Sequence, residues 1–422
     1  MTLIDDKPAP AEAPEPAGAS SARPSIKGNP WLPTPRGVWL VTGIELRRRR
    51  PTVKGWVFYG LLVAAILGLG ILVAAVSPEE KTSTPLEMVL VLVLGAGMLI
   101  APSLAATSIN GDSSEGVLAP LQMTRLTAGD LALGKLLSSW FIAFAVLLTT
   151  TPLLVYAFSR SGWHWDELLT VLGAILLVVL TSTAIGLAWS AIAARAVASV
   201  SLAHLTTGFL LLGTLLTFVF VQPLVSEDVA NTYAYPDYEQ MTPEQQQALD
   251  HAYETGDFSE LDVASLACIE ETSTYGVPHT ERIAWIVLAN PVVMIGEVSP
   301  IVSPLTYEED GRAAPGMFAA MHSSVSGWRI GPDEEQLTGD SYDECANLEA
   351  LAAGQDPYAD EQYSDEEWQA QWEAEQERSA TYDRAPWIGL GVEAALLLGS
   401  VWIVVARLRV PYKKLRAGSR VA

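Results

Sequence analysis

Cysteine is nearly absent from this sequence, which has two cysteines, Cys268 and Cys345, among 422 residues. The two do not have the spacing of a zinc ligand pair, and the five histidines are scattered, so the sequence offers no set of metal ligands. Both cysteines fall in one acidic region. We expect a disulfide between them if that region faces an oxidising compartment, and two unrelated free thiols are the alternative.

A phosphate-binding loop is also missing. The segment GDLALGK, from Gly129 to Lys135, matches the pattern G-x-x-x-x-G-K, but Leu136 follows where Ser or Thr should hold magnesium. The match comes after a polar loop instead of a buried strand, and it leads into an apolar segment. We interpret it as a coincidence, so we do not expect the chain by itself to be an ATPase or to bind a cofactor.

Charged side chains are scarce within the apolar segments. Proton-coupled and ion-coupled transporters carry ionisable residues along their pathway, and here only His204 is a candidate. The alternative interpretation of His204 is a helix-end residue that is hydrogen-bonded to a neighbour. Hydroxyl groups, such as those at 149–151 and 181–183, are more frequent and favour helix packing or a weakly polar path.

The sequence does have long apolar segments: half of its residues are apolar, and they gather in blocks of about twenty residues, the length that crosses the hydrocarbon of a bilayer. A segment in lipid must satisfy its own backbone hydrogen bonds, so these blocks predict helices. We therefore expect an all-α polytopic membrane protein with six transmembrane helices. Their predicted ranges are 56–76, 86–109, 136–158, 168–192, 200–222 and 387–406.

The net charge of −23 is concentrated in one region. Residues 223–385 hold 34 Asp and Glu and five Arg, so the rest of the chain is net positive. The basic residues outside this region alternate with the apolar blocks, as the positive-inside rule requires. We expect cytoplasmic N- and C-termini and an acidic region on the other side of the membrane. The first 35 residues lack an apolar core, so we expect no cleavable signal peptide there.

These observations predict six parts of the chain. They are a disordered cytoplasmic tail (1–35), an amphipathic helix (36–55), five transmembrane helices (56–222) with a cytoplasmic loop at 109–135, an extracytoplasmic acidic domain (223–386), the sixth transmembrane helix (387–406) and a basic cytoplasmic tail (407–422). Within the acidic domain we expect short helices after Thr242 and between 259 and 271.

One part of the acidic domain, residues 281–300, is apolar. Asn290 and Pro291 divide it into halves that are too short to cross a membrane. This pattern favours a re-entrant or interfacial hairpin, and the buried core of the outer domain is the alternative.

Two segments together carry a resemblance to a known family. The segment GVWLVTGIELRRRR lies before the first apolar block, and TSINGDSSEGVLAPLQMTRLTAGDLALGKLL lies between the second and the third. Their combination resembles type-2 ABC exporter permeases of bacteria, over all six apolar blocks. The resemblance implies an amphipathic connecting helix, and a cytoplasmic loop whose coupling helix docks on a separate ATP-binding subunit. It also implies that the apolar hairpin at 281–300 is similar to the family's re-entrant outer element.

The family's functional residues can be carried over by position. Glu45, Leu46 and Arg47 look like its E-L-R signature. The start of the family's loop is similar to Asn110, Gly111, Asp112, Glu115, Gly116 and Leu118. The coupling helix and its end are similar to the segment that contains Thr124, Arg125, Asp130 and Lys135. An ordinary loop with a capped helix is the alternative.

The resemblance implies a permease of the bacterial cytoplasmic membrane that exports an amphipathic or lipid-like compound. Its partners would be an ATP-binding subunit, which carries ATP and magnesium, and a second permease in a homodimer or heterodimer; no nucleic acid is expected. The alternative is a non-transporting membrane scaffold or sensor whose acidic outer domain binds a partner. The large acidic insertion departs from many relatives, and it is interpreted either as a solvated surface or as a site for cationic ligands.

Overall fold

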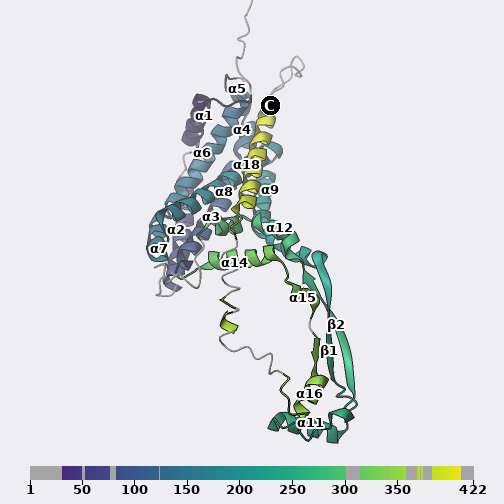
Figure 1. Ribbon diagram of the computed structural model, residues 1–422. Helices are drawn as coiled ribbons and strands as arrows, with labels where there is room; N and C mark the ends of the chain where they lie inside the picture. The colour runs from purple at the N-terminus through teal and green to yellow at the C-terminus, as the bar shows by residue number, and fades with distance from the viewer. Residues whose placement is uncertain are drawn as a thin grey trace, which may run out of the picture.

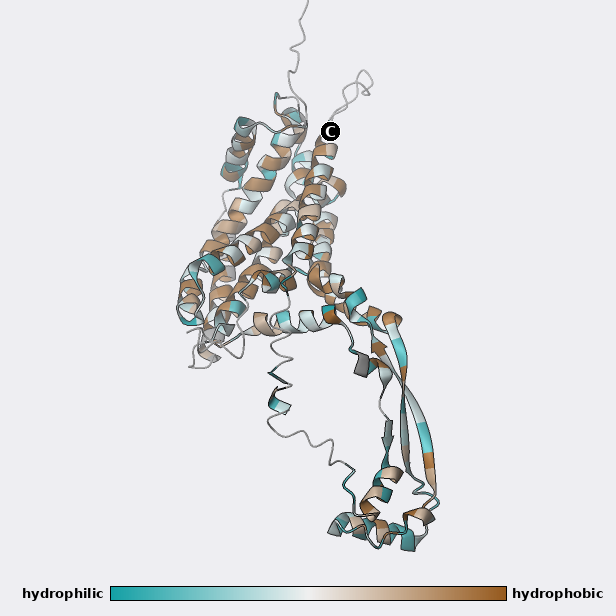
Figure 2. Cartoon of the chain, viewed as in Figure 1, coloured by the Kyte–Doolittle hydropathy of each residue, from teal (hydrophilic) through white to brown (hydrophobic). Residues whose placement is uncertain are grey.

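The structure is a computed structural model that describes residues 31–49, 53–76, 82–122, 124–300, 314–339, 341–357, 368–370, 372–373 and 383–409. The predicted N-terminal tail lies outside these residues up to position 30, and so does the basic tail after Arg409. The chain forms a helical bundle from which a long two-stranded ribbon projects to a small terminal domain (Figure 1). The bundle is mostly hydrophobic, and polar residues are more frequent in the ribbon and the terminal domain (Figure 2).

Within the described ranges, five helical runs are long and apolar enough to cross a membrane, as in a multi-pass membrane protein. They are Thr84–Ser114 (α3, Thr84–Ala105, and α4, Ser108–Ser114), Ala128–Leu148 (α6), Trp165–Ile192 (α8), Ala196–Val225 (α9, Ala196–Gly208; η1, Phe209–Gly213; α10, Thr214–Val221; η2, Gln222–Val225) and Pro386–Leu408 (α18). The first predicted span lies in α2, Val53–Val76, a helix of 24 residues whose described apolar stretch is Val63–Leu72. That sixth crossing therefore stays a prediction.

The predicted amphipathic helix is α1, Pro35–Arg48, which begins after the N-cap residue Thr34. Its inner face buries Val38, Val41 and Glu45, while Trp39 and Leu40 on the outer face are exposed. A helix with a polar buried contact and an exposed apolar face suits the boundary between a bundle and lipid. We call the end of the bundle that carries α1 and α4 the α1 end, and the opposite end the ribbon end (Figure 1).

The third predicted span is wrong in its bounds. The helix α6 begins at Ala128, before the predicted start at 136, and it ends at Leu148; a separate helix, α7, covers Thr151–Ser161. Pro152 has no N–H for a continuous helix. The hydroxyl groups of Thr149, Thr150 and Thr151 also donate to backbone carbonyls three residues earlier, which favours a chain break.

The predicted loop at 109–135 is largely helical, which corrects that expectation. It contains α4, the short helix α5 at Leu118–Gln122, and the first two turns of α6. Thr127 caps α6, and its hydroxyl accepts a hydrogen bond from the Asp130 N–H while the Asp130 carboxylate accepts one from the Thr127 N–H. This capping box fixes the start of the helix, so Asp130 and Lys135 belong to a membrane-candidate helix instead of a loop.

The all-α expectation is wrong for the acidic region. Strand β1, Ser226–Pro236, pairs antiparallel with β2, Cys268–Pro278, from Ser226 opposite Pro278 to Pro236 opposite Cys268. A short third strand, β3 at Ser341–Asp343, runs parallel to β1, so the strand order is β2-β1-β3. Threonine, tyrosine and valine in these segments favour strands, but the net acidity hides the pattern.

The terminal domain, which we call the tip, lies at the far end of the ribbon and contains α11, Pro243–Thr255, and α16, Glu344–Ala352 (Figure 1). The predicted helix start at Thr242 is confirmed, because Thr242 caps α11. The helix predicted over 259–271 is wrong: a single turn, η3 at Val263–Ser265, precedes β2 there. A small core that includes Leu249, Leu266 and Leu348 holds the tip together.

The predicted disulfide is confirmed, because Cys268 is bonded to Cys345. It joins the first residue of β2 to the first turn of α16, across 77 residues of sequence. The bond therefore connects the ribbon to the helical part of the tip.

The apolar segment at 281–300 is divided as predicted. Helix α12, Ala284–Leu288, and helix α13, Pro291–Val298, meet at Asn290, whose side chain caps α13. The Asn290 side-chain amide also donates to the carbonyls of Leu210 and Leu211, at 3.1 and 2.7 Å, within the π-helical turn η1. We call α12 and α13 the hairpin. It packs against α8, α10 and α18 of the bundle, and helix α14, Met317–Ile330, lies beside it.

Reduction of the disulfide is expected to loosen the tip and leave the bundle intact. The bond closes a loop of 77 residues, and such a constraint typically stabilises a domain by about 2–4 kcal/mol. Hydrogen exchange of α11 and α16 should accelerate after reduction, or in a Cys268→Ser/Cys345→Ser variant, while exchange in α8 stays unchanged. Equal exchange of the tip in both states would contradict this expectation.

Alkaline pH is expected to destabilise the tip through two tyrosines. The hydroxyl groups of Tyr238 and Tyr253 donate to the same oxygen of Glu344, at 3.0 and 2.9 Å. Burial, followed by the hydrogen bond to Glu344, raises the pKa of Tyr238 to about 12 and also raises the pKa of Tyr253. Folded-state pKa values above the unfolded value of 10 mean that this stabilisation is complete below about pH 10 and is lost toward pH 12. Tyrosinate absorbance during a pH titration checks this, with Tyr253→Phe as the comparison.

Candidate functional site

Six charged side chains meet at the α1 end of the bundle. They come from α1 and its C-cap residue, from α4 and its C-cap residue, and from α6. We call them the charged cluster: Glu45, Arg48, Arg49, Asp112, Glu115 and Lys135. Three are carboxylates and three are cations, so the cluster is balanced in charge.

Lys135 is at the centre of the charged cluster and has no exposed side-chain surface. Its ammonium nitrogen lies 2.5 Å from a carboxylate oxygen of Glu45 and forms a second ion pair with Asp112. The carbonyl and hydroxyl oxygens of Ser108 lie 3.4 Å away. A buried ammonium group is costly unless it is paired and hydrogen-bonded, and here all of its neighbours are oxygen acceptors. The position of Lys135 therefore requires α1, α4 and α6 to meet.

The two arginines complete the charged cluster from α1. Arg48 bridges Asp112 and Glu115, and its hydrogen bond to Asp112 raises the pKa of the guanidinium group. Arg49 lies 3.4 Å from Glu45 and donates to the carbonyl of Leu104, at 2.7 Å. Each carboxylate thus has at least one cationic partner, and the cluster ties the end of α1 to both neighbouring helices.

Close packing brings α1 into this position. A side chain at Gly134 would collide with Val41, because an added Cβ would lie 2.5 Å from the Val41 Cβ. The glycine and lysine of the segment GDLALGK therefore serve helix packing and ion pairing, since Gly134 contacts α1 and Lys135 is buried. In this structure the segment lies within a helix and does not form a phosphate-binding loop.

Asp130 connects the beginning of α1 to the beginning of α6. It is 1% exposed, and its carboxylate accepts hydrogen bonds from the backbone N–H of Thr34, at 2.5 Å, and of Thr127, at 2.9 Å. Gly37 packs directly on this carboxylate. Both ends of α1 are therefore attached to α6, one by Asp130 and the other by Lys135.

Asn110 and Gly116 shape α4 and the turn after it. The side-chain amide of Asn110 donates to the Ser199 hydroxyl, at 3.2 Å, which links α4 to α9. Gly116 has a φ of 72°, in the left-handed region that glycine adopts readily, and it ends the turn after α4. Both are structural positions within the predicted loop.

Three other predicted residues are exposed. Arg47, Thr124 and Arg125 lie on the surface of the α1 end, and the two arginines form none of the ion pairs found among the described residues. Glu115 is 63% exposed although it pairs with Arg48. Arg48 and Arg49 were not among the predicted site residues, although they lie in the run of four arginines. That run gave no sign of which members point toward carboxylates.

Several buried charges in the bundle were also missed, so the expectation that only His204 is a candidate is wrong. Glu87 of α3 accepts a hydrogen bond from the N–H of Phe318 at the start of α14, at 2.7 Å. Glu297 of α13 lies 2.9 Å from His322 of α14, and Glu393 of α18 is 2% exposed. His204 itself is hydrogen-bonded to Ser103, at 2.9 Å. For Glu87 and Glu393, the available sequence signal was a single acidic residue inside an apolar segment.

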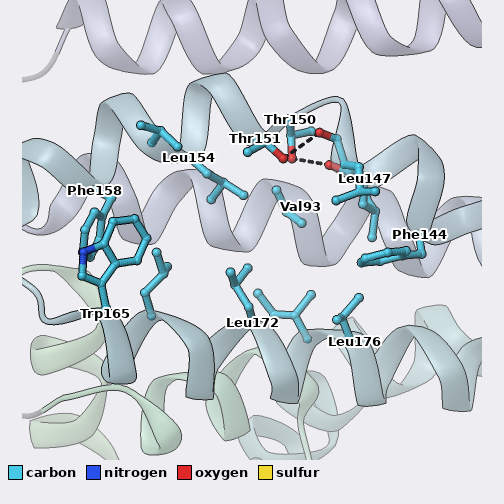
Figure 3. A pocket seen from close by; sticks show the side chains of 14 residues that line it. Val93, Phe144, Leu147, Thr150, Thr151, Leu154, Phe158, Trp165, Leu172 and Leu176 are labelled. Atoms are coloured by element: carbon cyan, nitrogen blue, oxygen red, sulfur yellow. Dashed lines mark hydrogen bonds between the residues drawn. The ribbon is translucent and has the colours of Figure 1, made fainter.

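An apolar cavity of about 170 Å³ lies between α3, α6, α7 and α8 (Figure 3). It occupies the place where α6 ends and α7 begins, and its lining includes Leu147, Leu172 and Phe158. Its hydroxyl groups, from Thr150 and Thr151, already donate to backbone carbonyls. The cavity can therefore hold an apolar group but offers no strong polar recognition.

Replacement of Lys135 by methionine is expected to destabilise the fold by about 3 kcal/mol or more. Glu45 and Asp112 would lose their shared buried partner, although each keeps one arginine, so the low end of the usual range for a broken buried pair applies. Denaturant unfolding of the purified protein in mild detergent checks this.

The matched control for this prediction is Arg47→Met, since Arg47 is exposed and outside the charged cluster. A change within about 0.5 kcal/mol is expected there. Similar losses in the two variants would contradict the central position of Lys135.

Comparison of this chain with protein-family models, with curated proteins and with solved structures finds no match. No group of three or more metal-binding side chains lies together within the described ranges. The charged cluster and the apolar cavity are therefore the two features on which an interpretation of function depends.

Proposed function

We propose that this protein is the membrane-spanning permease subunit of an ATP-driven ABC exporter in the cytoplasmic membrane of a bacterium. The energy comes from a separate ATP-binding subunit, and two permeases form the complex. The observation that carries the proposal is the charged cluster, because it joins the interfacial helix α1 and the helix α4 to α6. The resemblance of the same two segments to type-2 exporter permeases supports this function.

A rigid connection at this end suits mechanical coupling. Closure of an ATPase dimer moves the elements that it contacts, and coupling requires a contiguous packed network between that surface and the membrane helices. Lys135 lies in the second turn of α6, and its ion pairs bridge α6 to α1 and α4. A displacement of α1 or α4 therefore reaches the start of a membrane-candidate helix directly.

The exposed residues at the α1 end are the docking surface in this proposal. Arg47, Thr124 and Arg125 are exposed, and Glu115 is largely exposed. The buried carboxylates and Lys135 provide rigidity, and the exposed side chains meet the ATP-binding subunit. This division explains why the two segments that resemble exporter permeases contain both buried charged residues and exposed residues.

The proposed substrate is amphipathic or lipid-like. The apolar cavity accommodates a short hydrocarbon group, and exposed Leu148, Val155 and Trp165 lie on its rim, on the flank of the bundle. A substrate arriving from the bilayer would meet this opening laterally. The run Ala196–Val225 is the least buried of the five and leaves Phe209, Leu212 and Phe220 exposed, a face that suits lipid or the second permease.

The disulfide supports the proposed orientation. Cys268 and Cys345 are bonded in the tip, and disulfides persist in oxidising compartments. The α1 end then faces the cytoplasm with the basic residues, and the ribbon and tip face outward.

A second candidate is a scaffold or sensor whose outer domain binds a partner. The observation that favours it is the ribbon, since nine of the eleven residues of β2 are exposed and, among the described strands, β2 pairs with β1 alone. An exposed strand edge is a recognised surface for the addition of a strand. This candidate requires no ATP-binding subunit.

Co-purification with the ATP-binding subunit encoded in a neighbouring reading frame tests the proposed function. The wild-type protein is expected to recover the ATPase, and an Arg47→Glu/Arg125→Glu variant is expected to recover about tenfold less, because charge reversal opposes docking. Arg282→Glu, on the far side of the bundle, is the matched control and should recover the ATPase normally.

Two outcomes would contradict the proposal in different ways. Absence of any ATPase with the wild-type protein would remove the exporter function and favour the scaffold. Normal recovery with the double variant would retain the exporter but place the docking surface elsewhere. Unfolding curves of all three proteins should coincide, since these arginines are exposed.

A further inference from the structure

Glu393 is a buried carboxylate with few polar neighbours among the described residues. It lies seven residues after the start of α18, which is about 10 Å along the helix axis. The residue is 2% exposed, and its side chain is hydrogen-bonded to Thr181 of α8. The other carboxyl oxygen, Oε2, has no hydrogen-bond partner among the described residues.

The cations near the helices that contact α18 are already engaged. The elements packed on α18 are α6, α8, α12 and α13, and their charged residues are Asp130, Lys135, Asp166, Glu167 and Glu297. Lys135 belongs to the charged cluster, and Glu297 is paired with His322. Asp166 and Glu167 lie in the first turn of α8, about 20 Å along that helix from Thr181.

The arginine within α18 and the arginine just before it do not pair with Glu393 either. Arg384, before the helix, donates to the carbonyl of Ser299, at 3.1 Å, and Arg407 is exposed near the opposite end of α18. Within the described part of the chain, no cation is therefore positioned to neutralise Glu393. An ionised carboxylate in this apolar environment would be strongly unfavourable.

The hydrogen bond to Thr181 does not supply a counter-charge. The Thr181 hydroxyl donates its single hydrogen to the carbonyl of Leu177, at 3.1 Å. This hydroxyl therefore offers Glu393 at most a shared hydrogen bond and no positive charge. Without a counter-charge, burial favours the neutral carboxylic acid.

The apolar cavity does not extend to α18, and the hairpin packs beside Glu393. The apolar cavity is lined by residues of α3, α6, α7 and α8, and none of its lining residues lies on α18. One turn toward the ribbon end, Gly389 packs against Met294 and the carbonyl of Leu288, so the hairpin covers this face of the helix. A proton is the one cation that needs no space.

We propose that Glu393 is a proton-binding site inside the helical bundle, occupied at neutral pH, and that loss of this proton separates α18 from α8. The buried face of α18 carries the small residues Gly389 and Ser400 on either side of Glu393, which allows close approach of its neighbours. An ionised carboxylate requires water, and water enters only if the two helices part. The contact between α18 and α8 is therefore controlled by pH.

The first test is infrared spectroscopy of the full chain in lipid nanodiscs at neutral pH. A carbonyl band of a protonated carboxylic acid is expected in the wild-type spectrum and should be lost in Glu393→Gln. The control Glu254→Gln, at an exposed position of α11, should keep the band. If the Glu393→Gln spectrum keeps the whole band, the residue is ionised and the proposal is overturned.

The second test is thermal unfolding of the same proteins between about pH 7 and about pH 9, where buried glutamates can titrate. The wild-type midpoint should fall by at least about 3 °C more than that of Glu393→Gln, which keeps the shape of the neutral acid without a titrating proton. Ser400→Ala, on the same buried face, should follow the wild type. Identical pH profiles for the wild type and Glu393→Gln would overturn the proposal.

A metal cation is the competing occupant. Replacement of sodium by potassium or choline at constant pH should leave the wild-type midpoint unchanged, and a shift that Glu393→Gln abolishes would overturn proton binding. Neither test uses an ATP-binding subunit, so their results are independent of the proposed function.

Discussion

The burial of Lys135 is the constraint on which the α1 end of this protein depends. An ammonium group without exposed surface must find its counter-charges inside the protein, and they come from two other helices, Glu45 on α1 and Asp112 on α4. Without that meeting, the C-terminal half of α1 would lose its buried ion pair with α6. The hydrogen bonds of Asp130 hold the other end of the same helix. Helix α1 is thereby fixed at both ends to α6.

The requirement that a buried polar group has a partner also applies at the ribbon end, where the groups are neutral or carry single charges. The π-helical turn η1 presents backbone carbonyls to the Asn290 amide, and the Glu87 carboxylate receives the N–H of Phe318. Glu297 is matched with His322. These contacts join the hairpin and α14 to the bundle. Glu393 has an unpaired carboxyl oxygen and no cationic partner among the described residues, which is the reason for assigning a proton to it.

These two ends relate to the proposed export cycle in different ways. The charged cluster is a rigid connection that suits the transmission of force, whereas Glu393 lies where two membrane helices meet and can respond to a proton. The apolar cavity is a third feature, formed at the break between α6 and α7. The break itself follows from Pro152 and the threonines before it. A small number of local sequence features thus places a rigid joint, an apolar site and a titratable contact in one bundle.

The sequence by itself determined the properties that depend on neighbouring residues. Apolar length predicted the helices α8 and α18 nearly to their ends, the Asn290–Pro291 pair predicted the division of the hairpin, and Thr242 predicted the start of α11. The position of both cysteines in one acidic region predicted the disulfide between them. These results share a cause, because hydrogen bonding within a helix, capping and the transfer of an apolar run into lipid are local effects.

Only the tertiary structure decided which distant groups meet. Lys135 pairs with Glu45 across 90 residues, and β1 pairs with β2 although their sequences alternate weakly and a helix lies between them. The run of four arginines gave no indication that Arg48 and Arg49 pair with carboxylates while Arg47 does not. Glu393 is a single acidic residue in an apolar segment. Only the three-dimensional structure shows that the neighbouring cations of the described chain pair with other groups. The physical reason is that the free energy of a buried charge depends on what three-dimensional packing places around it, and a linear pattern does not contain that information.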